Sequence, residues 1–399
     1  MPQNNIEAPN SRIEAIDFLR GLVMIIMALD HVRMYFALGT WYSEPTNLAT
    51  TTPLLFFTRW ITHFCAPVFV FLAGTSAYLY GTRRANIRET ALFLLTRGLW
   101  LVFVELVIVN FAWTFDITYS FGILQVIWAI GISMVVLSAL VFLPDRFILI
   151  IGALLVFGHN PLDPIRFEGS SALNLIWYVL HQPHSVFIDS THLINFVYPV
   201  LPWIGLMALG YVLGSLYRKD FPLEQRKRWL LNIGGVATLL FLLLRGFNLY
   251  GEPHSWQTED TFIFSFISFL NTTKYPPSLH FLLMTIGPAL IFLSAIESAG
   301  KRLPGPVTVF GKVPFFFYVV HLYVIHTLAM LLLIYEGHDW HQYILSARGI
   351  MSGTLRNFGL GLGAVYIIWI VVIVSLYPLC RWYRAHRENH PSQWWLSYL

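Results

Sequence analysis

The sequence predicts an all-α fold: a polytopic membrane bundle of about 10 transmembrane helices, with both termini in the cytoplasm. Three observations lead to this prediction. The 399-residue chain is 56% hydrophobic and only 12% charged, whereas a soluble globular chain is about 25% charged. Its apolar residues form runs that reach the ~17–25 residues needed to cross a bilayer. Its basic residues gather between alternate runs, as the positive-inside rule requires.

Ten apolar runs are candidate membrane spans. They lie at 16–38, 54–80, 89–112, 121–143, 146–158, 194–216, 229–245, 279–297, 307–334 and 358–380. The fifth run is short, and the apolar segment 262–270 is shorter still, so we predict that the latter lies at the membrane interface. The spans make up one transmembrane domain, 16–383, between cytoplasmic tails at 1–15 and 384–399.

The distribution of basic residues supports ten spans. With the N-terminus inside, most loop Lys and Arg residues fall on the inner side, and the outer segments hold Arg166, Arg245, Lys274, Arg348 and Arg356. Without the short fifth span, the basic segment "RKDFPLEQRKR" would lie outside, against the positive-inside rule. We therefore expect a multi-pass protein of the inner cell membrane, in contact with the lipid bilayer. The chain has no phosphate-binding or nucleic-acid-binding motif, so no nucleic acid partner is expected.

The two cysteines and the N-terminal run exclude other classes. Cys65 and Cys380 lie in or beside apolar runs, and we interpret them as buried free thiols rather than a disulfide framework or a zinc motif. The first apolar run is too long and too charged for a cleaved signal peptide. We expect it to remain as a membrane helix.

Ionisable residues inside the apolar runs are the candidate functional groups. Each costs roughly 2.5–3.5 kcal/mol at the bilayer centre on insertion scales, so such residues usually face the protein interior and mark function. The first run, "RGLVMIIMALDHVRMYF", carries Arg20 and His31 eleven residues apart, on one helix face. Asp30 and Arg33 are an i,i+3 pair that can neutralise each other.

Helix geometry predicts that several of these groups share one depth. The second run carries Arg59 and His63, and the third carries Arg97 and Glu105. With a rise of 1.5 Å per residue, one polar layer toward the outer face would contain Asp30, His31, Arg59, His63 and Glu105. Arg20 and Arg97 would lie toward the inner face. The sequence thus predicts a path from an inner cationic mouth to an outer imidazole–carboxylate cluster.

Histidine is the natural proton acceptor near neutral pH. A buried His next to Asp, as His31 is next to Asp30, is the usual arrangement of a general base, because the acid fixes the tautomer of the imidazole. The alternatives are structural ion pairs between helices and, for His321 and His326, hydrogen-bonded helix contacts. A metal site is not expected, because the spacing of these residues matches no ligand pattern. The outer segments 159–193 and 246–278 are either a ligand-facing vestibule or plain loops.

Five stretches carry a resemblance to a known family. They are "RIEAIDFLRGLVMIIMALDHVR" (12–33), "FTRWITHFCAPVFVFLAGTSAYL" (57–79), "RGLWLVFVEL" (97–106), "KYPPSLHFLLMTIGP" (274–288) and "GKVPFFFYVVHLYVIH" (311–326). Together they resemble bacterial membrane proteins related to heparan-α-glucosaminide N-acetyltransferase, within a wider set of transmembrane acyltransferases. The resemblance spans nearly the whole chain, and its first two motifs are the most specific.

This resemblance implies transfer of an acetyl group from cytosolic acetyl-CoA to a sugar or amino-sugar acceptor, such as a cell-envelope glycan, on the outer side. The CoA phosphates would be held by Arg20, Arg97, Arg83 and Arg84. His31 would take the proton of the acceptor as a general base, and Asp30 or Glu105 would orient it. Arg59 or His63 would stabilise the developing oxyanion. The segment 39–53 has no counterpart of the outer-loop histidine proposed as catalytic in the animal enzyme. His31 does match the late first-helix histidine of the broader acyltransferase families.

Two questions stay open at the level of sequence. The acyl group can move directly or through an acyl-histidine intermediate, and the protein can be a monomer or a homodimer. The alternative function is a proton-coupled small-molecule transporter, which would use the same buried charges as a proton relay.

Overall fold

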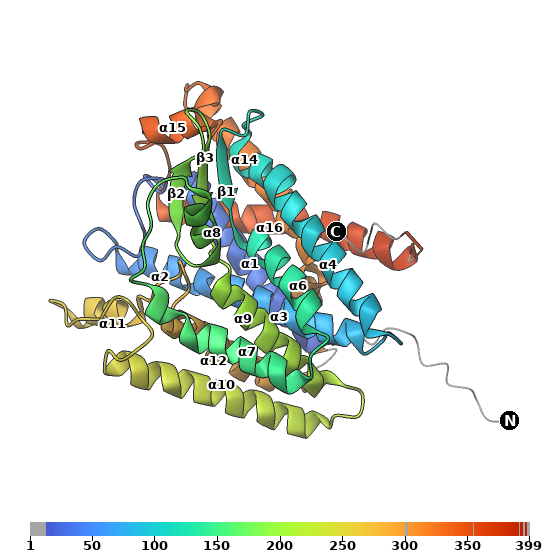
Figure 1. Cartoon of the computed structure of the whole chain (residues 1–399). Helices are drawn as coiled ribbons and strands as arrows, with labels where there is room; N and C mark the ends of the chain where they lie inside the picture. The colour runs from blue at the N-terminus through green and yellow to red at the C-terminus, as the bar shows by residue number, and fades with distance from the viewer. Residues whose placement is uncertain (1–12, 300–301, 354, 391, 394–395, 397–399) are drawn as a thin grey trace.

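A computed structural model describes residues 13–299, 302–353, 355–390, 392–393 and 396. Most of the predicted N-terminal tail lies outside the described residues. The fold is a bundle of long helices with a small sheet at one end, drawn at the top of Figure 1. The helices are α1 (Glu14–Phe36), α2 (Pro53–Ile61), α3 (Cys65–Gly81), α4 (Ile87–Val104), α5 (Asn110–Thr114), α6 (Val126–Leu140), α7 (Asp145–Gly158), α8 (Ala172–Leu180), α9 (Leu201–Leu213), α10 (Leu223–Gly246), α11 (Phe262–Leu270), α12 (Leu279–Ile296), α13 (Gly305–Lys312), α14 (Pro314–Tyr335), α15 (Ala347–Ser352) and α16 (Leu362–Asn389).

The predicted helical membrane class is confirmed. Among the described residues, six helical segments are long and apolar enough to cross a membrane: Pro53–Gly81, Ile87–Thr114, Leu223–Gly246, Leu279–Ile296, Pro314–Tyr335 and Leu362–Asn389. The helix α1 lies at the centre of the bundle, and its charged residues Asp17, Asp30 and Arg33 are buried by its neighbours. The first predicted span is therefore a helix of the bundle although it carries charges, because neighbouring helices bury those charges.

Three predicted spans have different local structure from the one expected. The run 121–143 begins with strand β1 (Phe121–Leu124), and the run 194–216 begins in strand β3 (Leu193–Phe196). The two strands pair in parallel, and β2 (His184–Phe187) pairs antiparallel with β3. The run 307–334 is two helices, because Pro314 starts a new helix directly after the end of α13. An apolar run does not distinguish a short strand from a helix turn.

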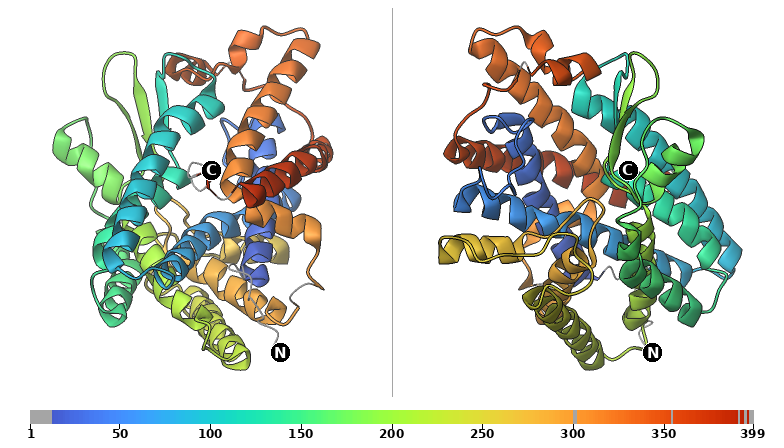
Figure 2. Two further views of the ribbon diagram at one scale, coloured as in Figure 1. Left: turned by 90° about the vertical axis from the view of Figure 1, so that its right-hand side faces the viewer. Right: turned by 60° about the vertical axis from the view of Figure 1, so that its left-hand side comes forward.

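Close contacts between helices depend on small residues. A Cβ atom on Gly311 of α13 would lie 1.7 Å from the carbonyl oxygen of Asp17 in α1, and one on Gly21 would lie 2.0 Å from the oxygen of Val307. The helices α1 and α13 therefore cross with their backbones in contact, as small residues permit in membrane bundles. The two views in Figure 2 show α1 surrounded by later helices of the chain. This packing brings the N-terminal helix against α14, where the site is built.

Candidate functional site

A cavity of about 320 Å³ lies beside the sheet and is called the sheet cavity below. Its walls come from α1, the segment after it, α2, β1, β3 and the segment before α12. Its ionisable and polar residues include Asp30, His31, Arg33, Glu44, Arg59, Gln125, Asn195, Tyr198, Lys274 and Tyr275. Three cations and two carboxylates line it, so a net positive charge faces the space. Of the two long outer segments, 246–278 contributes Lys274 and Tyr275 to the lining, whereas no residue of 159–193 lines the cavity.

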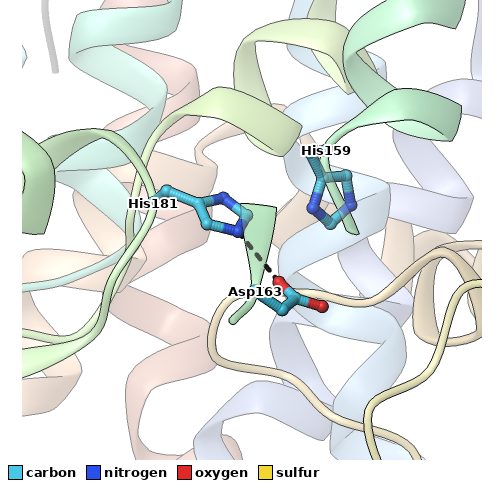
Figure 3. A group of neighbouring side chains, drawn as sticks. All are labelled: His159, Asp163 and His181. Carbon is cyan, nitrogen blue, oxygen red and sulfur yellow. Dashed lines mark hydrogen bonds and ion pairs between the residues drawn. The ribbon is translucent and has the colours of Figure 1, made fainter. Parts of the chain in front are cut away.

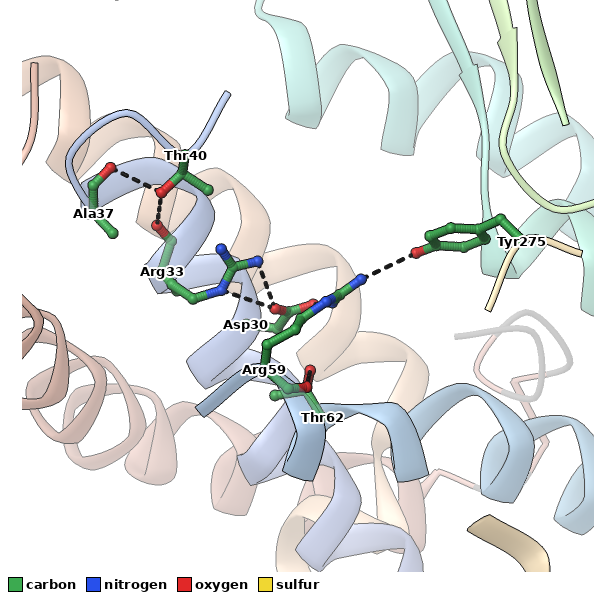
Figure 4. A network of polar contacts seen from close by, with 7 residues as sticks. All are labelled: Asp30, Arg33, Ala37, Thr40, Arg59, Thr62 and Tyr275. Carbon is green, nitrogen blue, oxygen red and sulfur yellow. Dashed lines mark hydrogen bonds and ion pairs between the residues drawn. The ribbon is translucent and has the colours of Figure 1, made fainter. Parts of the chain in front are cut away.

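Figure 4 shows the ion-pair network at this cavity. The carboxylate of Asp30 accepts hydrogen bonds from Arg33, with 2.9 Å between Nη2 and Oδ1, and from Nη1 of Arg59. Arg59 also reaches the hydroxyl of Tyr275 at 3.5 Å. All three charged side chains are buried. The predicted i,i+3 pair of Asp30 and Arg33 is therefore present, and Arg59 joins it from a second helix.

His31 is oriented by a second histidine. Its Nδ1 lies 2.7 Å from Nε2 of His321, a residue of α14. His321 Nδ1 lies 2.8 Å from the carbonyl oxygen of Phe317, which can only accept a hydrogen bond. In the neutral pair, His321 therefore carries its proton on Nδ1, and its Nε2 accepts from Nδ1–H of His31. This tautomer, assigned from the hydrogen-bond network, gives Nε2 of His31 a lone pair that can act as a base.

Sequence reasoning treated His321 as a helix contact and assigned the orienting role to Asp30 or Glu105. The structure differs because Arg33 and Arg59 each form an ion pair with the carboxylate of Asp30. His321, rather than Asp30, contacts Nδ1 of His31. No local signal pairs His31 with a residue 290 positions away. The second C-terminal histidine, His326, lies between the carbonyl oxygens of Ala112 and Tyr343, at 2.9 Å from each. It has the expected role of a hydrogen-bonded helix contact.

His63 and Glu105 do not line the sheet cavity. His63 lies in the 3₁₀ turn η1 (Thr62–Phe64), which follows directly after the end of α2. Its ring packs against Phe281, with 5.3 Å between centroids. Glu105 begins a π-helical turn, a feature frequent at functional sites. One of its oxygens accepts the backbone N–H of Gln125 at 2.9 Å. Glu105 thus shapes the wall of the cavity rather than contacting His31.

A second cavity of about 380 Å³ is called the basic cavity below. Arg20 and Arg97 line it, as does Tyr80. Two further cations that the sequence analysis did not single out, Lys312 and Arg387, also line it. Lys312 lies near the start of the run 307–334 and Arg387 follows the last run, so each resembles an ordinary flanking charge at a membrane boundary.

The other predicted phosphate ligands lie beside the basic cavity rather than in its wall. Arg84 lies over the ring of Tyr80 at 4.7 Å and within 4.0 Å of Glu89, and Arg83 is exposed in the turn after α3. Arg20 itself bridges two elements, with 3.1 Å to Asp17 and 3.0 Å to the hydroxyl of Ser76.

The two cavities lie back to back. Met27, Phe69 and Val126 line both of them, so the same three side chains separate the spaces. Arg20 and His31 stand roughly 16 Å apart along α1 at 1.5 Å per residue. A flexible ligand that binds through anionic groups in the basic cavity would have to pass only these side chains to reach His31.

The described residues thus form a helical membrane bundle with a buried imidazole pair and a cationic cavity behind it. The family model described as heparan-alpha-glucosaminide N-acetyltransferase, catalytic, matches residues 12–250, more than half of the chain. The chain belongs to this family and is an N-acetyltransferase-type membrane enzyme. No curated protein matches the chain. The matched region contains His31, Arg59 and Arg20, whereas His321 and Lys312 come from the C-terminal part outside it.

Proposed function

We propose that the protein transfers an acetyl group from acetyl-CoA, bound in the basic cavity, to an amino-sugar or glycan acceptor in the sheet cavity. The observation that carries this proposal is the arrangement of two cavities of different chemistry on either side of Met27, Phe69 and Val126. The basic residues of one suit the phosphates of CoA. The imidazole in the other suits a proton acceptor. The inner bias of basic loop residues favours a cytosolic donor and an outer acceptor.

In the proposed reaction, the acceptor amine attacks the thioester carbonyl carbon. The new C–N bond forms, the C–S bond breaks, and CoA leaves as a thiolate that takes up a proton. Nε2 of His31 accepts the proton released by the amine, while His321 holds the imidazole in the required tautomer. Arg59, on the wall of the same cavity, would stabilise the negative charge that develops on the carbonyl oxygen. A hydroxyl acceptor would react by the same steps.

The test is turnover of radiolabelled acetyl-CoA by the purified full-length protein in detergent, with a panel of amino sugars. We expect His31→Ala to bind acetyl-CoA but to lose 10²–10⁴-fold in turnover, the usual contribution of a general base. His338→Ala, which removes an exposed histidine outside both cavities, is the matched control and should react like wild type.

Two outcomes would contradict the proposal. If the folded wild-type protein binds no CoA thioester, acetyl-CoA is not the donor. If His31→Ala keeps full activity, His31 is not the general base. In the first case, uptake of labelled sugars into liposomes, with and without a proton gradient, tests the alternative of proton-coupled transport.

A further inference from the structure

A second cluster of histidines lies in the outer segment, away from both cavities. His159 follows α7, Asp163 follows the 3₁₀ turn η3 (Asn160–Leu162), and His181 follows α8. Figure 3 shows the three side chains facing one another, with the ring of His159 beside that of His181. Both histidines are only 2% exposed. None of the three residues lines the sheet cavity or the basic cavity.

The hydrogen bonds of this cluster are incomplete. Nε2 of His181 lies 2.8 Å from Oδ1 of Asp163, and Oδ2 of Asp163 accepts a hydrogen bond from Asn160 at 2.9 Å. Among the described residues, Nδ1 and Nε2 of His159 and Nδ1 of His181 have no hydrogen-bond partner. Buried polar atoms are nearly always paired, and an unpaired one points to an ion or water that occupies the space.

The geometry of the donor atoms suits a metal ion. One ligand atom from each of His159, Asp163 and His181 lies within 4.8 Å of the other two. A tetrahedral zinc site with bonds of about 2.0–2.2 Å holds its ligand atoms about 3.3 Å apart. Small side-chain movements therefore close the three residues around an ion. The hydrogen bond from Asn160 to Asp163 is the outer contact that commonly orients a ligating carboxylate.

We propose that His159, Asp163 and His181 bind a divalent transition-metal ion, with Zn²⁺ as the best match. Two imidazoles and one carboxylate are a known zinc ligand set, with the fourth position taken by water. Fe²⁺ also uses this ligand set, but its octahedral sphere needs more open positions than a buried cluster offers. The sequence analysis did not single out this site, because His181 lies 18 residues beyond Asp163 and meets the turn between His159 and Asp163 only in the fold.

A bound ion would link separate elements at the outer end of the bundle. The ligands come from the ends of α7 and α8 and from the turn between them, and Asn160 also accepts the backbone N–H of Leu279 at 3.1 Å. The ion would therefore link the outer segment that leads into the sheet to the start of α12. This role is structural and does not rest on the proposed acetyl transfer.

The test is zinc binding by the full-length protein in detergent, after removal of any affinity tag and treatment with EDTA. We expect Zn²⁺ titration, followed by metal analysis of the gel-filtered protein, to give one ion per chain and a higher melting temperature. His159→Gln and His181→Gln should weaken binding at least 100-fold. His192→Ala is the matched control, because it removes a histidine of the same outer segment whose side chain is 45% exposed, and it should bind like wild type.

Equal zinc binding by wild type and His159→Gln would overturn the proposal, as would no stoichiometric binding by wild type. Because a buried substitution can unfold the chain, the gel-filtration profile of each metal-free variant is compared with that of wild type. A measurement on the wild type alone removes the remaining ambiguity. Co²⁺ in place of Zn²⁺ should give the visible absorption of a tetrahedral site with nitrogen and oxygen ligands, and a spectrum equal to that of Co²⁺ in buffer refutes the site.

Discussion

The contact between His31 and His321 makes the most specific prediction about the proposed reaction. Nδ1 of His31 and Nε2 of His321 are 2.7 Å apart in a buried environment, and the carbonyl of Phe317 determines which nitrogen of His321 carries the proton. His321→Ala removes the acceptor that holds His31 in the tautomer with a free Nε2. His321→Gln keeps a side-chain oxygen that can accept the same hydrogen bond.

The magnitude follows from the value of one hydrogen bond. A typical hydrogen bond contributes about 0.5–1.5 kcal/mol net. We take this value as the free energy by which His321 favours the productive tautomer and orientation of His31, which His321→Ala would lose. Since 1.4 kcal/mol is a factor of ten, kcat should fall about 2- to 12-fold. The buried Nδ1–H of His31, left without a partner, should also destabilise the protein by about 1–3 kcal/mol. The KM for acetyl-CoA should stay unchanged, because neither histidine lines the basic cavity.

The assay is steady-state acetyl transfer by wild type, His321→Ala, His321→Gln and His31→Ala, with thermal unfolding of each in detergent. Recovery of kcat by His321→Gln distinguishes positioning of His31 from general destabilisation. The reasoning is refuted if His321→Ala leaves kcat unchanged. It is also refuted if His321→Gln unfolds at the wild-type temperature but is as slow as His321→Ala.

Three further perturbations test other parts of the structure. Lys312→Ala should raise the Kd for acetyl-CoA about 10-fold, as expected for loss of one charge-assisted hydrogen bond, with less effect on CoA analogues that lack phosphates; isothermal titration measures both. Gly311→Val should abolish folded expression, because a Cβ atom there would lie 1.7 Å from the oxygen of Asp17, and a normal gel-filtration profile would contradict the close crossing of α1 and α13. Burial alone would raise the pKa of the Asp116 carboxyl, but hydrogen bonds from Ser120 and a neighbouring threonine outweigh it and hold that pKa below 3.8. The charged Asp116 side chain therefore stabilises the folded protein above the pKa that it has in the unfolded state, and this stabilisation is lost as pH falls through its pKa in the folded state. Asp116→Asn should thus lower the melting temperature at pH 7 and differ least from wild type below pH ~3.

Local patterns predicted the parts of the site that depend on one helix. Asp30 and Arg33 form the expected pair because a separation of three residues places them on one helix face wherever the helix lies. Arg20 and His31 line different cavities at the two levels that the helix rise predicts. His63 and Glu105, which the same arithmetic placed at the depth of His31, lie in the turn η1 and in a π-helical turn and do not line the sheet cavity.

The sequence by itself determined the membrane class and the burial of Asp30, Arg33 and Arg59, because hydrophobic length and composition act locally along the chain. Its motifs determined the family. Only the tertiary structure decided which of those charges meet. The partner of His31 is 290 residues away, and the basic cavity is completed by Lys312 and Arg387 from the far end of the chain. Likewise, the fold brings His181 at the end of α8 to His159 and Asp163, which flank the turn η3. Contacts between distant residues depend on how helices cross and how turns close, and neither leaves a periodic signal in the sequence.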